Sequence, residues 1–352
     1  MRVELTRRRF LAVTAAAATA LAVAPGLTGC SPGADRLVVY SNAASDGRGD
    51  WMIANAKEAG FDVTVVDLGG GDLKNRLIAE RARPQADVVF GLNDAFFYQL
   101  IDEEVLQPYE PSWANDVDKA FGDREYFWPM YRFPILLVYS TAVWTEETAP
   151  TDWPALWEDP TFANQYETPA ALGGMTSQTV IAGILSRYRS EKEGNIAGVA
   201  PEGWAAMDQY FQNGNRAVEG TDLFARIASG DVSMGQMWMH GRIPREEQFQ
   251  VETRGVSPEI GVPTVVESIA MVNDTPRADL AARFIDWFGS AETAAAWSNE
   301  FYYVPVNEEA LPNADQQAIA EANSFDIQEI DWRFVAANLD EWIERVTLRY
   351  LT

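Results

Sequence analysis

Apolar runs typical of buried strands alternate with helical spacing of apolar residues in the first half of the chain. The segment 36–42 reads RLVVYSN and the segment 61–67 reads FDVTVVD, and both are mainly apolar. A helical pattern follows each of them, over 49–59 and through 73–78. A third strand at 86–91 precedes another helix. Such alternation with short connections predicts an α/β fold with mainly parallel sheets flanked by helices.

The pattern continues less regularly through the second half, and no internal repeat is present. The C-terminal part is expected to be mostly helical. The predicted elements are strands at 135–140, 232–239 and 262–272, helices at 176–187 and 278–288, and further helix from about 316.

The first thirty residues have the pattern of an export signal. A basic head precedes an alanine-rich apolar run that is shorter than the roughly 20 residues of a bilayer span. The motif TRRRFL (6–11) resembles a twin-arginine export signal, and LTGC (27–30) resembles a lipobox. The prediction is a Tat-type lipoprotein signal peptide over 1–29, a lipidated Cys30 and a tether over 30–35. An ordinary cleaved signal with an incidental cysteine is the alternative.

Composition limits the classes of partner. The hydrophobic share of 47% over 352 residues is enough for two medium domains and excludes a disordered chain. The formal charge is −25, so nucleic acid and anionic lipid headgroups are poor partners. Cys30 is the only cysteine, which excludes an intramolecular disulfide.

The residue types favour binding over catalysis. The chain has one histidine and lacks the Gly-x-Ser-x-Gly elbow of serine hydrolases. Metal sites built on paired histidines or cysteines need more than one of each. Carboxylates are abundant enough for a glycosidase-like acid pair, but no pattern singles one out. We therefore expect no enzymatic activity, no cofactor and no resident metal.

Ligand contacts are expected where parallel strands end and loops lead into helix N-termini. The glycine-rich segments before Asp72 and Thr176 are candidate anion cradles, although tight turns and helix capping explain them equally well. Trp238 could stack on a planar or cationic ligand, with core packing as the alternative. The residues of this predicted site are Ser41, Asn42, Gly70, Gly71, Asp72, Asn93, Asp94, Thr176, Ser177, Trp238, His240 and Arg242.

Several motifs together resemble the type II periplasmic solute-binding proteins of ABC importers, in the group that binds iron, thiamine and phosphonates. The resemblance extends over nearly the whole mature chain. Besides the lipobox, the motifs are LVVYSN at 37–42, NRLIAE at 75–80, ADVVFGL at 86–92, VYS at 138–140 and YVPV at 303–306.

The resemblance implies two α/β lobes joined by two crossing hinge strands, which close around a solute. Lobe 1 would comprise 36–130 plus 265–352, with C-terminal helices that reach across to lobe 2, and lobe 2 would comprise 131–264. The crossings would lie near Pro129–Pro134 and near Pro263–Ser268.

The closest resemblance is to thiamine-binding members, and it adds Thr221, Asp222 and Tyr302 to the candidate ligand contacts. A phosphonate or sugar phosphate would fit the two cradles equally well, with Arg242 as its charge partner. Ferric-binding relatives carry a tyrosine pair where this chain has 236–240, so a ferric-iron carrier is the less favoured alternative.

The expected function is that of a substrate-binding lipoprotein of an ABC importer, which captures thiamine or its phosphates, a phosphonate or a sugar phosphate between its lobes by hinge closure. The protein would be anchored to the outer face of the cytoplasmic membrane by its lipid alone. It would face the cell surface or the periplasm, act as a monomer, and have permease and ATPase subunits as partners. The alternatives from other classes are an exported hydrolase and a structural or adhesive lipoprotein.

Overall fold

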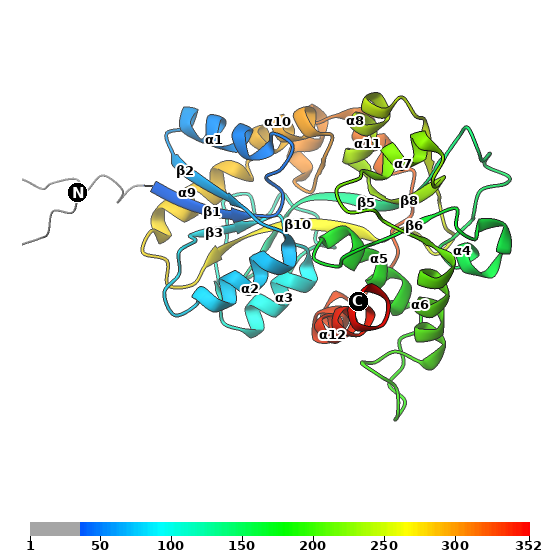
Figure 1. Cartoon of the computed structure of the whole chain (residues 1–352). Helices are drawn as coiled ribbons and strands as arrows, with labels where there is room; N and C mark the ends of the chain where they lie inside the picture. The colour runs from blue at the N-terminus through cyan, green and yellow to red at the C-terminus, as the bar shows by residue number, and fades with distance from the viewer. Residues whose placement is uncertain (1–35) are drawn as a thin grey trace, which may run out of the picture. The chain divides into compact units, whose positions relative to one another are not determined.

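Three parallel strands form the first part of the sheet in the computed structural model, which describes residues 36–352 (Figure 1). β1 lies between β2 and β3 and pairs with both. Figure 1 shows α1 above these strands and α2 and α3 below them, as the alternating pattern predicts. The elements are β1 (Arg36–Ser41), α1 (Arg48–Glu58), β2 (Asp62–Asp67), α2 (Gly70–Glu80), β3 (Val88–Phe90) and α3 (Asp94–Asp102).

Two long strands continue the sheet in the antiparallel direction. β5 (Trp128–Ser140) pairs with β10 (Thr264–Val272) through its first half and with β8 (Met234–Trp238) through its second half. The two segments predicted as crossings are therefore direct neighbours, with Thr264 opposite Pro134. The remaining strands are β4 (Leu106–Gln107), β6 (Glu167–Thr168), β7 (Asn215–Arg216), β9 (Thr253–Gly255) and β11 (Val304–Pro305).

The sheet is thus mixed rather than mainly parallel. Among the named strands that the structure describes, parallel pairing is confined to β1 with β2 and β3, and to the short pair of β6 and β7. Every pairing made by β5 or β10 is antiparallel. The sequence pattern indicates which segments are strands, but it does not give the direction in which a returning strand crosses the sheet.

Helices of the second half mostly follow the predicted positions. His240 and Arg242, predicted to follow a strand, lie in the first turns of α8, which begins directly after β8. The helices are α4 (Ala155–Glu158), α5 (Met175–Ser186), α6 (Pro201–Asn213), α7 (Leu223–Ser229), α8 (Met239–Phe249), α9 (Ala278–Phe288), α10 (Ala291–Phe301), α11 (Gln316–Ala322) and α12 (Trp332–Val346), with short helical turns at Pro160–Phe162, Glu308–Asn313 and Thr347–Leu351.

The C-terminal helix α12 contacts segments that are far apart in the sequence. Asp340 pairs with Lys74 of α2 at 2.7 Å, and Trp342 Nε1 donates to the carbonyl oxygen of Ala197 at 2.9 Å. Five apolar residues of α12 that recur at helical spacing are buried, namely Val335, Ala336, Leu339, Trp342 and Val346. Within 36–352 no helix has the length and apolar character needed to cross a membrane. The predicted signal peptide, Cys30 and the tether lie outside the described residues.

Candidate functional site

Two helices begin beside each other at glycines from distant parts of the chain. α2 begins after Gly69 and α5 begins after Gly174, and neither N-terminus receives a side-chain cap. A side-chain carbon at Gly69 would lie 3.6 Å from the carbonyl oxygen of Gly173, so the two loops are in near contact. The first turn of a helix leaves backbone N–H groups without helical partners, and these attract anions. We call residues 69–71 and 173–174 the glycine cradle.

The other predicted residues of the first loop lie at the same place. Gly70 is buried, and a side-chain carbon there would come within 3.1 Å of the Phe96 ring. A side-chain carbon at Gly71 would lie 3.7 Å from the carbonyl oxygen of Gly173. Asp72 is exposed in the first turn of α2, where a carboxylate stabilises the helix but competes with a bound anion.

Asn42 brings a side-chain amide to the cradle from the end of β1. Its Nδ2 lies 3.7 Å from Met175 Sδ, and its buried Oδ1 has no hydrogen-bond partner among the described residues. Gly91 has φ 102°, and a side-chain carbon there would lie 2.8 Å from Asn42 Oδ1, so this approach requires glycine. Ser41 has a local role, because its buried Oγ accepts a hydrogen bond from the Ala43 N–H at 3.0 Å.

Asn93 and Asp94 stand at the start of α3. Asn93 caps the helix by accepting a hydrogen bond from the Phe96 N–H at 3.2 Å, which is a structural role. Burial, with a smaller contribution from Asp123, raises the pKa of Asp94 to about 7. Asp94 Oδ1 has no hydrogen-bond partner within the described part of the chain.

Ser177 links the first turn of α5 to β8. Its Oγ accepts a hydrogen bond from Gln236 Nε2 at 2.7 Å, and Gln236 Oε1 is buried without a partner in 36–352. Thr176 is half-buried in the same turn. The hydroxyl groups of this turn and the Gln236 amide of β8 therefore lie beside the glycine cradle.

A second group of predicted residues surrounds a cavity of about 480 Å³. Asp222, His240 and Tyr302 line it together with Arg48 and Arg245. Thr221 is exposed and is not among the lining residues. The structure thus places predicted residues at two sites, the glycine cradle and this cavity, while Trp238 and Arg242 are likewise not among the residues that line the cavity.

Trp238 and Asp222 have partners within the chain. Asp222 caps α7 through the Phe224 N–H and pairs with Arg245 Nε at 2.9 Å. The Arg245 guanidinium in turn lies 4.7 Å from the centre of the Trp238 ring. In this structure Trp238 therefore stacks on the guanidinium of Arg245, at the ring face predicted to hold a planar or cationic ligand.

His240 is buried among aromatic rings. Its ring stacks on Tyr303 with centroids 3.9 Å apart and meets the edge of Phe133 at 4.5 Å. Burial, and then the positive charges of Arg48 and Arg245, lower the pKa of His240 well below its usual value. The imidazole is therefore neutral at physiological pH, and its Nδ1 has no partner among residues 36–352.

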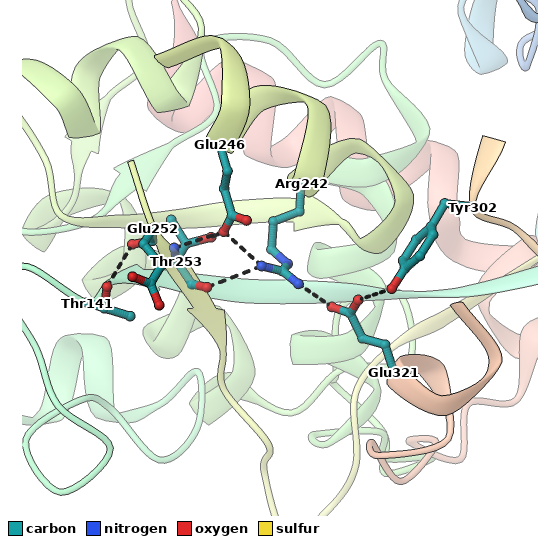
Figure 2. A network of polar contacts seen from close by, with 7 residues as sticks. All are labelled: Thr141, Arg242, Glu246, Glu252, Thr253, Tyr302 and Glu321. Carbon is teal, nitrogen blue, oxygen red and sulfur yellow. Dashed lines mark hydrogen bonds and ion pairs between the residues drawn. The ribbon is translucent and has the colours of Figure 1, made fainter. Parts of the chain in front are cut away.

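Arg242 belongs to a network of ion pairs and hydrogen bonds (Figure 2). Its guanidinium lies 2.8 Å from Glu246 Oε1 and 2.6 Å from Glu321 Oε1. It also donates to the Thr253 carbonyl oxygen at 3.2 Å, and Tyr302 Oη donates to Glu321 Oε2 at 2.9 Å. We call these five residues the Arg242 network. Two of the predicted ligand contacts, Arg242 and Tyr302, are thus already engaged by carboxylates.

The sequence interpretation missed a second polar group, on β10. Glu267 is only 3% exposed and faces Tyr131 of β5 across the sheet, next to a β-bulge at Ser268. Burial raises its pKa to about 8, and Arg48 opposes that rise. The signal in the sequence is one acidic residue inside the apolar strand TVVESIAMV. Bulges of this kind often adjoin functional sites.

Comparison with known proteins shows relatives that bind solutes. Residues 52–323 match the family described as bacterial extracellular solute-binding protein. The chain is 34% identical to the "Probable ABC transporter periplasmic-binding protein y4fP" of Sinorhizobium fredii, over 90% of this chain and 86% of that protein. It is 26% identical to a Salmonella typhimurium protein named "Putative 2-aminoethylphosphonate-binding periplasmic protein", over 88% and 90% of the two chains.

Solved structures show the same fold at lower identity. Pasteurella haemolytica apo ferric ion-binding protein A matches with a TM-score of 0.75 at 14% identity, over 90% of this chain and 98% of that chain. The fold is therefore that of the two-lobed α/β type II periplasmic binding proteins. The family and these relatives bind solutes and do not transform them, so the protein is not an enzyme. The chain belongs to the bacterial extracellular solute-binding protein family and serves as the extracellular or periplasmic binding protein of an ABC importer.

Proposed function

We propose that the solute is a small organic molecule with a phosphonate or phosphate group, held at the glycine cradle. The observation that carries this proposal is the meeting of two uncapped helix N-termini, with Gly69 and Gly173 in near contact. Asn42 adds an amide that can donate after rotation about its side chain. The 26% identical relative named for 2-aminoethylphosphonate supports the same class of solute.

The two loops of the cradle come from the two lobes expected at 36–130 plus 265–352 and at 131–264. An anion that contacts both loops stabilises the closed arrangement over an open one, which couples capture to closure. We further propose that β5 and β10 form the hinge, that the closed monomer docks on the permease, and that lipidation of Cys30 anchors the protein.

The other solutes considered from the sequence have less support. A planar ring such as that of thiamine would need Trp238 or Tyr302, and these contact Arg245 and Glu321 instead. Within 36–352, no three His, Cys, Asp or Glu side chains form a group that could hold a metal ion. Sugar phosphates belong to the same chemical class as the proposed solute.

The test is thermal unfolding of the purified protein with 2-aminoethylphosphonate, methylphosphonate, glucose 6-phosphate, thiamine and ferric citrate. A solute at about 100 times its dissociation constant adds about 2.7 kcal/mol, which raises the melting temperature by several degrees. We expect this rise with at least one phosphorus compound. A rise with thiamine or ferric citrate alone would overturn the proposal.

A further inference from the structure

Glu267 is a buried acid whose presence the fold does not explain. It is the only charged residue of β10, and its Oε2 has no hydrogen-bond partner among the described residues. A buried carboxylate without a partner is costly, and an apolar residue of similar size would serve a strand better. Because burial of this acid destabilises the fold, we expect Glu267 to have a role other than packing.

The groups around Glu267 come from β5, α1, α8 and the loop between α10 and β11. Tyr131 of β5, whose buried hydroxyl also has no partner in the described part of the chain, lies opposite it. Tyr303 follows α10 with its ring 5.5 Å from that of Tyr131, and His240 of α8 stacks on Tyr303. Arg48 of α1 directs its guanidinium to the carbonyl of Ala43 at 2.9 Å and to Ser45 Oγ at 2.7 Å.

We call Glu267, Tyr131, Tyr303, His240 and Arg48 the Glu267 cluster. An acid surrounded by tyrosine rings is a favourable environment for a cation, because the carboxylate and the ring faces are both negative. His240 is neutral, which leaves Arg48 as the one positive charge of the cluster, and that charge is already engaged by Ala43 and Ser45.

Contacts made by Gly91 and Asn42 connect the strand of Glu267 to the glycine cradle. The Gly91 N–H donates to the carbonyl oxygen of Ser268 at 2.9 Å. A side-chain carbon at Gly91 would lie 2.8 Å from Asn42 Oδ1, and one at Gly70 would lie 3.6 Å from Asn42 Nδ2. A solute held at the glycine cradle therefore lies beside the strand that carries Glu267.

We propose that Glu267 binds a positively charged amino group of the solute, so that the solute is a zwitterion with its anionic group at the glycine cradle. This inference rests on the proposed function and narrows it to aminoalkyl phosphonates and similar aminophosphates. Burial holds Glu267 largely protonated near neutral pH in the free protein. An ammonium group favours the carboxylate, so binding releases the Glu267 proton to the solvent.

Isothermal titration calorimetry tests the inference with 2-aminoethylphosphonate and with ethylphosphonate, which lacks the amine. In Glu267→Gln we expect 2-aminoethylphosphonate to bind at least about tenfold more weakly, because a hydrogen bond to a charged group is lost. Ethylphosphonate should bind both proteins alike. Glu341→Gln, which removes an exposed carboxylate of α12, is the control for loss of charge and should bind like the wild type. Equal weakening of both solutes in Glu267→Gln would overturn the inference.

Proton release gives a second readout that does not depend on stability. Titrations at pH 7 in buffers of different ionisation enthalpy should show that the wild type releases more protons than Glu267→Gln on binding 2-aminoethylphosphonate. The two proteins should release the same number on binding ethylphosphonate, because any proton lost by the phosphonate group itself is common to both. Equal proton release by the wild type and Glu267→Gln on binding 2-aminoethylphosphonate would count against the role of Glu267. If no phosphonate binds but putrescine binds in a Glu267-dependent way, the proposed function fails and the ammonium site stands. Binding only of solutes without an amino group overturns the ammonium site.

Discussion

The Glu267 cluster and the Arg242 network are both polar groups held inside the fold, yet they differ in how their charges are satisfied. Arg242 has two carboxylates within 2.8 Å and a backbone carbonyl besides. Glu267 Oε2 has no partner among the described residues, and neither do the Tyr131 hydroxyl and His240 Nδ1 near it. In the Arg242 network the charges are paired and only Arg242 Nε lacks a partner among residues 36–352, whereas several neighbouring buried atoms without partners indicate a place where a ligand supplies them.

The largest expected effect concerns the paired network. Arg242→Met leaves Glu246 and Glu321 without their common cation, which should lower the free energy of unfolding by about 3 kcal/mol. Urea unfolding measures this change, and solute affinity should stay as in the wild type. A large loss of affinity with little loss of stability would instead make Arg242 a ligand contact, as the sequence first indicated.

Glu267→Gln should have the opposite effect on the free protein. The pKa of Glu267 is raised from 4.5 to about 8 in the folded state, so its contribution to stability is complete below 4.5 and is lost as the pH rises to 8. The variant lacks this loss and should be more stable than the wild type at pH 8.5, by on the order of 2 kcal/mol. Urea unfolding at pH 5 and pH 8.5 checks the sign. A variant less stable at pH 8.5 would mean that Glu267 is structurally paired.

His240 should account for part of the fall in the free energy of unfolding below pH 6.5. Its folded pKa lies below the usual 6.5, so its contribution is present above pH 6.5 and is lost as the pH falls through the folded value. His240→Gln should flatten the fall in stability between pH 6.5 and 5, by up to about 1.4 kcal/mol per pH unit. Unchanged slopes in the two proteins would show that the imidazole is not buried as neutral.

The smallest expected effect on stability is that of Tyr131→Phe. The hydroxyl has no partner within 36–352, so its removal should change the free energy of unfolding by less than about 0.5 kcal/mol. A matched change in the paired network, Tyr302→Phe, removes a hydrogen bond to Glu321 and should cost about 1 kcal/mol. Equal costs for the two variants would remove the distinction between the two regions.

Local pattern predicted the elements but not the partners across the fold. The helix expected at 278–288 has those bounds, because its apolar spacing is regular. The strand expected at 135–140 begins earlier, at Trp128, since two prolines mask the strand pattern and pairing with β10 determines its extent. Of the two carboxylates on Arg242, Glu246 is one helical turn away, while Glu321 is brought near only by tertiary folding.

Some candidate site residues could likewise be predicted from local sequence, while others depend on contacts across the fold. The glycines of the cradle stood out because loops before helices are visible in sequence, and the structure places them together. Glu267 was overlooked because one acid in an apolar strand carries no motif, and its meaning depends on Tyr131 and Arg48 from other elements. The ligand roles of these residues stay predictions that the variants above can separate.

A crystal structure of the protein with 2-aminoethylphosphonate would locate both charged groups of the solute. We expect phosphonate oxygens at the N-termini of α2 and α5, and the amino nitrogen within hydrogen-bond distance of Glu267. A solute bound against Arg242, with the Arg242 network opened and Glu267 still without a partner, would contradict it.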